Sequence, residues 1–140
     1  MVIIVDTREQ KPYDFGAILT EKCCLRAGDY SIQGLEQSIA VERKTVDDFV
    51  SSIIHERERF FAELSLLQAY DHACIVVESN LTDILAARYH SKTHPSSVLG
   101  TIVSIHLRFG IPVFLCDDRA GGQIFTLRYL KLAHERWSVR

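Results

Sequence analysis

Residues 41–49 read Val41-Glu42-Arg43-Lys44-Thr45-Val46-Asp47-Asp48-Phe49. An apolar run precedes this stretch and indicates a β-strand over residues 38–44. After it, apolar side chains recur at positions i, i+3, i+4, i+7 and i+8, which is the spacing of one face of an amphipathic helix. The stretch is therefore predicted to join a strand to a helix. The apolar helix positions are Val46, Phe49, Val50, Ile53 and Ile54.

Charged side chains crowd this junction. Because the side chains of a strand alternate between its two faces, we expect Glu42 and Lys44 on one face and Arg43 on the other. Thr45 is the predicted N-cap of the helix, which places Asp48 in the first turn, where the helix dipole favours a carboxylate. Taken alone, a Glu-Arg-Lys triplet is also typical of a solvated surface patch, so its interpretation depends on the rest of the chain.

The residues before the junction predict a β-hairpin. Residues 28–33 have the composition of a strand, residues 34–37 that of a turn, and residues 38–44 form the returning strand. If the turn is centred between Leu35 and Glu36, Asp29 lies directly opposite Glu42. Like charges in that arrangement destabilise a sheet, whereas a cation between them reverses the effect. The alternative is that Asp29 only marks a turn beside Gly28.

A further carboxylate follows the first predicted strand. Residues 2–5 are continuously apolar, and the chain then continues Asp6-Thr7-Arg8-Glu9. A strand here would deliver Asp6 and Arg8 to its carboxyl end, although a polar loop after a core strand has the same appearance. On the first interpretation, Asp6, Asp29 and Glu42 meet at the ends of adjoining strands.

The rest of the chain alternates strands and helices. Hairpin strands followed by strand–helix units predict an α/β fold, a mixed β-sheet flanked by helices on both faces. The further predicted strands cover residues 23–27, 74–77 and 111–116. The further predicted helices run on from Ile54 to Leu67, cover residues 82–89, extend from a cap at Ser96 or Ser97 to Gly110, and follow Gly122.

Composition is that of one globular domain. The 140 residues are 47% hydrophobic and 24% charged, with a formal net charge of −2, so nothing in the total charge announces a nucleic-acid-binding protein. The first residues predict neither a signal peptide nor a membrane span. The four cysteines form no C-x-x-C pair, which favours reduced thiols over zinc or disulfides. We therefore expect an intracellular protein, cytoplasmic or nuclear, with no membrane partner.

The predicted carboxylate cluster indicates a metal-dependent phosphodiesterase. Oxygen ligands select a hard cation, Mg²⁺ or Mn²⁺. Such an ion, held by Asp29, Glu42 and a backbone carbonyl near Arg43, would activate a phosphate and a water molecule. Lys44 is placed to orient that water or to stabilise developing charge. Arg8 and Arg43 would either grip the phosphate or hold the carboxylates in bidentate pairs.

Three separated motifs in this order resemble the XPF-type structure-specific endonucleases. They are Val5-Asp6-Thr7-Arg8-Glu9, then Gly28-Asp29-Tyr30, then Glu42-Arg43-Lys44-x-x-x-Asp48. The resemblance covers residues 1–140 as a single nuclease domain. It implies a restriction-endonuclease-like core related to the PD-(D/E)xK nucleases. The implied activity is divalent-metal cleavage of DNA near duplex/single-strand junctions such as 3′ flaps and forks, in repair or recombination.

The resemblance also implies roles for individual residues. Asp29 and Glu42 would be metal ligands, with Asp6 and the backbone carbonyl of Arg43 as further candidates, and Lys44 the catalytic lysine. Residues 59–63 resemble an R-L-x-x-Q segment of the family, but Glu63 stands where Gln is usual. The supporting catalytic residues would be Asp6, Arg8, Arg43 and Asp48, and the predicted DNA contacts are Arg8, Arg59 and Lys92.

The resemblance also concerns a second domain, the oligomeric state and the DNA substrate. Family members usually carry a tandem helix-hairpin-helix domain after the nuclease, and none is expected within these 140 residues. The resemblance implies a homodimer formed by the nuclease domain, with branched or flap DNA as the substrate. The alternative function is a non-catalytic branched-DNA-binding or scaffold module of the same family.

Overall fold

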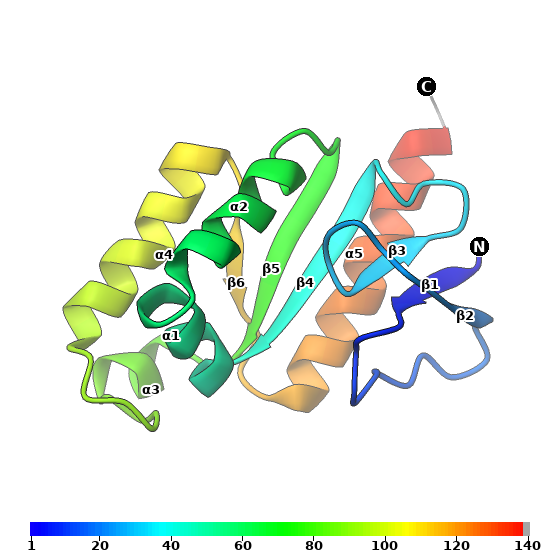
Figure 1. Cartoon of the computed structure of the whole chain (residues 1–140). Coiled ribbons are helices and arrows are strands. Elements are labelled where there is room, and N and C mark those ends of the chain that lie inside the picture. The colour runs from blue at the N-terminus through cyan, green and yellow to red at the C-terminus, as the bar shows by residue number, and fades with distance from the viewer. Residues whose placement is uncertain (139–140) are drawn as a thin grey trace.

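The computed structural model describes residues 1–138, which fold around a six-stranded mixed β-sheet (Figure 1). The strand order is β2-β1-β3-β4-β5-β6. Strands β1 and β2, β4 and β5, and β5 and β6 pair in parallel, whereas β3 runs antiparallel to both β1 and β4. The carboxyl ends of β1, β4 and β5 therefore share one edge of the sheet. The strands are β1 Ile3–Asp6, β2 Thr20–Cys23, β3 Tyr30–Ile32, β4 Ile39–Thr45, β5 His72–Glu78 and β6 Val113–Leu115.

The predicted hairpin register is confirmed. Tyr30 of β3 pairs with Val41 of β4, as a turn centred between Leu35 and Glu36 requires. Asp29 precedes β3 by one residue, and its backbone N–H donates a 2.8 Å hydrogen bond to the carbonyl of Val41. The register thus brings Asp29 alongside the charged end of β4.

Helices cover both faces of the sheet. Four of the described helices pack on one face, over a core that includes Ala40, Ile75 and Val77, whereas α5 packs on the other face, over Val41 and Val76. Figure 1 shows α5 on the opposite side of the sheet from α1 and α2. None of the helices within residues 1–138 has the length and apolar character that a membrane crossing requires. The helices are α1 Val46–Ile54, α2 Arg57–Leu67, α3 Leu81–Leu85, α4 Pro95–Phe109 and α5 Arg119–Ser138.

The strand-to-helix junction has the predicted form. Strand β4 ends at Thr45 and α1 begins at Val46 without an intervening loop. The Thr45 hydroxyl accepts a 3.1 Å hydrogen bond from the N–H of Asp48, which makes Thr45 the N-cap. On the inner face of α1, Phe49, Val50 and Ile53 are buried. Because no flexible residue separates cap and strand, the position of the Glu42–Lys44 segment is coupled to that of α1.

Several predicted boundaries were wrong. A strand over residues 23–27 was predicted, but β2 covers Thr20–Cys23, because Leu25 donates its N–H to Asp6 Oδ1 instead of to a sheet partner. The helix predicted to continue past Ile54 is interrupted at Glu56, whose φ of −125° lies outside the helical region. The helix predicted over residues 82–89 is the shorter α3, Leu81–Leu85. The strand predicted over residues 111–116 is the shorter β6, Val113–Leu115.

The caps of the last two helices also differ from prediction. His94, not Ser96 or Ser97, caps α4, because its Nδ1 accepts a hydrogen bond from the N–H of Ser96. Helix α5 starts at Arg119 and thus includes Gly121 and Gly122, which the sequence suggested lay before it.

Residues 11–14 are fastened to the start of α5. An Nη2 atom of Arg119 donates to the carbonyls of Lys11 and Pro12, each at 2.9 Å, and the side chain of Gln123 accepts from the N–H of Asp14 at 2.9 Å. A Cβ atom at Gly122 would overlap the hydroxyl of Tyr13. Only glycine therefore permits this close approach.

Candidate active site

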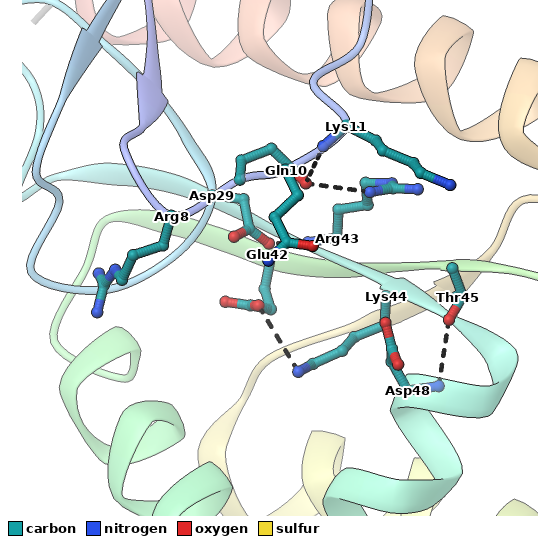
Figure 2. A pocket seen from close by; sticks show the side chains of 10 residues that line it. Arg8, Gln10, Lys11, Asp29, Glu42, Arg43, Lys44, Thr45 and Asp48 are labelled. Atoms are coloured by element: carbon teal, nitrogen blue, oxygen red, sulfur yellow. Dashed lines mark hydrogen bonds and ion pairs between the residues drawn. The ribbon is translucent and has the colours of Figure 1, made fainter.

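Two adjoining cavities lie at the carboxyl ends of β1 and β4. The first, of about 390 Å³, is lined by residues that include Asp29, Glu42, Lys44 and Asp48. The second, of about 500 Å³, lies on the α2 side and is lined by Glu63 among others. Both share Arg8, Asp29 and Lys44. The structure thus brings residues from three sequence motifs into one concave region (Figure 2).

Asp29 is held in place by backbone interactions. Gly28 has a φ of +82°, and a Cβ atom there would lie only 3.0 Å from the Cβ of Ala40, so glycine allows the turn that presents Asp29. Asp29 Oδ2 then accepts a 2.8 Å hydrogen bond from the N–H of Arg43. Burial and, to a smaller extent, the charges of Glu9 and Glu63 raise the pKa of Asp29, whereas interactions with Glu42 and with the N–H of Arg43 lower it; the net result is a pKa of about 6.

Glu42 is a buried acid of β4. Its residue exposure is 6%, and its Oε2 atom is buried without a hydrogen-bond partner. Burial raises the pKa of Glu42 well above its ordinary value, and the charges of Asp29 and Glu63 raise that pKa further, while Lys44 lowers it. An orphaned carboxylate oxygen in a buried position is costly. A cation bound there would remove this cost.

Lys44 is on the same face of β4 as Glu42, as predicted. Its Nζ lies 4.0 Å from Glu42 Oε1 and 5.2 Å from the centre of the Phe60 ring. Figure 2 shows the ammonium reaching toward Glu42, with Asp48 beside it at the start of α1. The lysine side chain is 20% exposed, so it is positioned by its neighbours yet remains accessible from the cavity.

Arg43 points to the other face of the sheet. Its Nε and Nη2 atoms donate to the two carboxylate oxygens of Glu78, at 2.9 and 3.1 Å, and Nη1 donates to Glu9 at 3.2 Å. The Tyr13 hydroxyl donates to the same Glu78 carboxylate. Of the two roles open to Arg43, gripping phosphate or holding carboxylates, this geometry supports the second. Although burial raises the pKa of Glu78, its bonds with Arg43 and Tyr13 hold that pKa below its ordinary value.

Asp6 has its own partners. Its carboxylate accepts from Arg8 Nε at 2.8 Å and from the N–H of Leu25 at 2.9 Å. Burial opposes ionisation, but these hydrogen bonds hold the pKa of Asp6 below its ordinary value. Arg8 also donates to the carbonyl of Leu25 at 2.8 Å. Asp6 therefore anchors Arg8 and the segment after β2, and its oxygens are already engaged.

The three predicted DNA contacts are not all in one place. Arg8 and Arg59 line the second cavity, with side chains 67% and 81% exposed. Arg59 also forms a 3.0 Å ion pair with Glu56. Lys92 is exposed in the loop before α4 and lines neither of these two cavities.

The residues present fit a hard divalent cation. Asp29 and Glu42 offer oxygen atoms only, and one of these atoms, Glu42 Oε2, is buried and unpaired. Within residues 1–138, no three His, Cys, Asp or Glu side chains already converge as the ligands of one ion would. Mg²⁺ is commonly held by one or two carboxylates, with water and substrate phosphate completing its shell, so two carboxylates suffice.

Sequence reasoning missed the residues that surround Arg43. Glu9, Tyr13 and Glu78 surround the Arg43 guanidinium, yet none was a predicted site residue. The sequence did contain a signal for Glu78, because it is an acid at the end of a buried strand, as Asp6 is. Tyr13 had none, because its position depends on contacts with α5.

Comparison with known proteins places the chain in a family. A model described as the ERCC4 domain matches residues 5–125. The putative ATP-dependent RNA helicase MJ1505 of Methanocaldococcus jannaschii is 36% identical over 120 residues, which are 83% of this chain and 14% of that protein. The chain thus spans about a seventh of the length of this curated relative.

Solved structures agree. XPF from Aeropyrum pernix, alone and in complex with DNA, is 26% identical with a TM-score of 0.75 in both cases. The similarity covers 95% and 96% of this chain and 61% and 66% of those chains. The fold is that of the XPF nuclease, and the chain belongs to the ERCC4 domain family.

Proposed function

We propose that this domain is a divalent-metal-dependent DNA endonuclease that hydrolyses phosphodiesters near junctions of duplex and single-stranded DNA, such as 3′ flaps and forks. One observation carries the proposal. The carboxylates of Asp29, which is half-buried, and Glu42, which is buried, share a cavity with the Lys44 ammonium, whose Nζ is 4.0 Å from Glu42 Oε1. Paired acids beside an amine are a sensible arrangement for phosphodiester hydrolysis.

Each residue has a stated part. Asp29 and Glu42 hold Mg²⁺ or Mn²⁺, which when bound supplies a Lewis acid to the phosphate and makes water more acidic. Lys44 donates hydrogen bonds that orient the attacking water or stabilise negative charge on the phosphate oxygens. Arg43 keeps the end of β4 in place from the opposite face, and Asp6 holds Arg8 at the cavity.

DNA is the proposed substrate. Family membership supports it, as does the likeness to a solved XPF chain in complex with DNA. The exposed guanidinium groups of Arg8 and Arg59 border the second cavity, where they can contact phosphates. The loop that carries Lys92 lies against α1, since His90 of the same loop forms a 2.9 Å ion pair with Asp47 of α1. Lys92 would therefore contact DNA only if the duplex extends past α1. Such contacts make binding strongly salt-dependent.

A homodimer is part of the proposal. Helices α4 and α5 carry large apolar side chains that are open to solvent, including Leu107 at 78% and Ile124 at 71% exposure. Large apolar side chains that are open to solvent are typical of interaction surfaces, and most oligomers are symmetric. Light scattering should give a mass near twice 15.9 kDa; a monomer at high concentration would contradict the dimer.

The deciding experiment compares cleavage of a labelled 3′-flap duplex, a plain duplex and a single strand, in Mg²⁺, Mn²⁺ or EDTA. We expect metal-dependent cutting near the junction by the wild type, none by Asp29→Asn, and normal cutting by Glu58→Gln, which changes an exposed acid of α2. DNA binding without cutting by the wild type would instead favour the scaffold function. Equal cutting by wild type and Asp29→Asn would contradict the assigned site.

A further inference from the structure

We propose that Glu63 is an outer carboxylate of the cation site, accepting hydrogen bonds from the water molecules of an ion held by Asp29 and Glu42. This inference rests on the proposed function and extends it to a residue on a different element. Glu63 belongs to α2, which reaches the site from the face of the sheet that Glu42 and Lys44 share.

Glu63 lies beside the proposed metal ligands. It is partly buried and lines the second cavity together with Asp29 and Lys44. It is also close to both acids: its carboxylate interacts electrostatically with Asp29 and Glu42, and with Glu42 through a side-chain contact as well. Three carboxylates from β4, α2 and the turn before β3 thus face one another across the two cavities.

The surrounding cations balance these charges only in part, because Arg8 interacts with Glu63 as well as with Asp6, and the other arginines have carboxylate partners of their own. Arg8 is paired with Asp6, Arg59 with Glu56, and Arg43 with Glu78 and Glu9 behind the sheet. Lys44 approaches Glu42 only through Oε1.

The orphaned oxygen gives an independent sign of a ligand. Glu42 Oε2 is buried and has no hydrogen-bond partner. Because the Glu42 side chain is only 8% exposed, bulk solvent does not satisfy this oxygen either. A buried acceptor of this kind needs a cation, a proton or water. With Asp29 and Glu63 both nearby, a hydrated cation satisfies all three carboxylates at once.

Glu63 acts through water rather than as a direct ligand. Within the described chain no three acidic, histidine or cysteine side chains converge on one point. Mg²⁺ gives up its water reluctantly and usually keeps several molecules. Groups that hydrogen-bond to such water orient it, and their removal typically lowers metal affinity about 10- to 100-fold. Glu63 is therefore a positioning residue.

The test measures Mn²⁺ binding without DNA, by calorimetry, for wild type, Glu63→Gln, Glu63→Asp and the matched control Glu58→Gln. Glu63→Gln keeps shape and helix preference but removes charge, and we expect about 10-fold weaker binding. Glu63→Asp should lie between Glu63→Gln and wild type, and Glu58→Gln should match wild type. Wild-type affinity in Glu63→Gln overturns the inference.

Thermal melting in EDTA separates this role from a structural one. Removing one of three mutually repelling carboxylates should raise the melting temperature of Glu63→Gln, whereas loss of a structural contact would lower it and overturn the inference. If Asp29→Asn loses Mn²⁺ binding but Glu63→Gln does not, only the role of Glu63 fails. If the wild type itself binds no Mn²⁺, the proposed function fails as well.

Discussion

Arg43 and Glu78 are joined by two hydrogen bonds, of 2.9 and 3.1 Å, on the face of the sheet opposite to Glu42 and Lys44. The alternation of side chains along β4 therefore divides the Glu-Arg-Lys triplet. Glu42 and Lys44 point away from Arg43 (Figure 2), which fastens β4 to β5 through Glu78. One strand end thus carries both the side chains that we propose for catalysis and the ion pair that fixes their position.

Breaking this pair should be costly. The side chains of Arg43 and Glu78 are 11% and 7% exposed, so Glu78→Ala leaves a largely buried guanidinium without its main partner. We expect the free energy of unfolding to fall by about 3–5 kcal/mol in urea denaturation. The control is Arg88→Ala, which removes the ion pair between Asp83 and Arg88, whose side chain is 70% exposed; it should cost less than about 1 kcal/mol. Similar losses in both variants would contradict the argument.

Lys44 should matter to cleavage but not to metal binding. Lys44→Met keeps an unbranched aliphatic side chain and removes the ammonium, together with its cation–π contact with Phe60, so we expect cleavage to fall about 10²- to 10⁴-fold. Mn²⁺ affinity should be equal or higher, because a positive charge leaves the site. Lys22→Met, on the exposed strand β2, should leave cleavage unchanged. Loss of Mn²⁺ binding in Lys44→Met would exclude this division of roles.

The stability of the metal-free protein should depend on Asp29 ionisation. The pKa of Asp29 is about 6 in the folded protein, against ~3.9 for an unfolded chain. Between these values the folded state binds more protons, so the contribution of Asp29 to stability falls as pH rises from 4 to 6. Asp29→Asn has no ionisable group at this position, so it should not lose this stability as pH rises. Its melting temperature in EDTA should therefore increase relative to wild type over this pH range, and a constant difference would show that Asp29 is not perturbed.

The contact between α5 and Tyr13 can be tested by adding one methyl group. Gly122→Ala should lose about 1–3 kcal/mol, because the new Cβ overlaps the Tyr13 hydroxyl. Combining it with Tyr13→Phe should recover part of that loss. Gly100→Ala, in α4, meets no atom within 4 Å, so it should gain up to about 1 kcal/mol from helix propensity. If the double variant is as destabilised as the sum of its single changes, the overlap is not the cause.

The central part of the fold was predictable because its signals are local. The apolar spacing after Thr45 and the composition of the turn at 34–37 predicted α1 and the pairing of Tyr30 with Val41, both of which are confirmed. Those two elements already place Asp29 beside Glu42. Strand β2 was misplaced because all four of its residues are exposed, so it has no apolar pattern.

The support of the site was not predictable in the same way. Arg43 finds Glu78 at a separation of 35 residues, and the Gly122 position is understandable only once Tyr13 is seen against α5. Such contacts have no periodic signature in the sequence. The glycine pair in particular has the composition of a loop but lies inside a helix.

The fastening of residues 11–14 to α5 has a consequence for the order of folding. Arg119 and Gln123 bind backbone groups of residues that are separated from them by 107 to 109 positions. During synthesis, strand β1 and Tyr13 leave the ribosome first. Tyr13 can take its final position beside Arg43 only once α5 has also been synthesised. Contacts of such long range slow folding, since a large loop must close before they form. The nascent chain therefore completes the surroundings of Arg43, beside the first cavity, only after almost the whole domain has been synthesised.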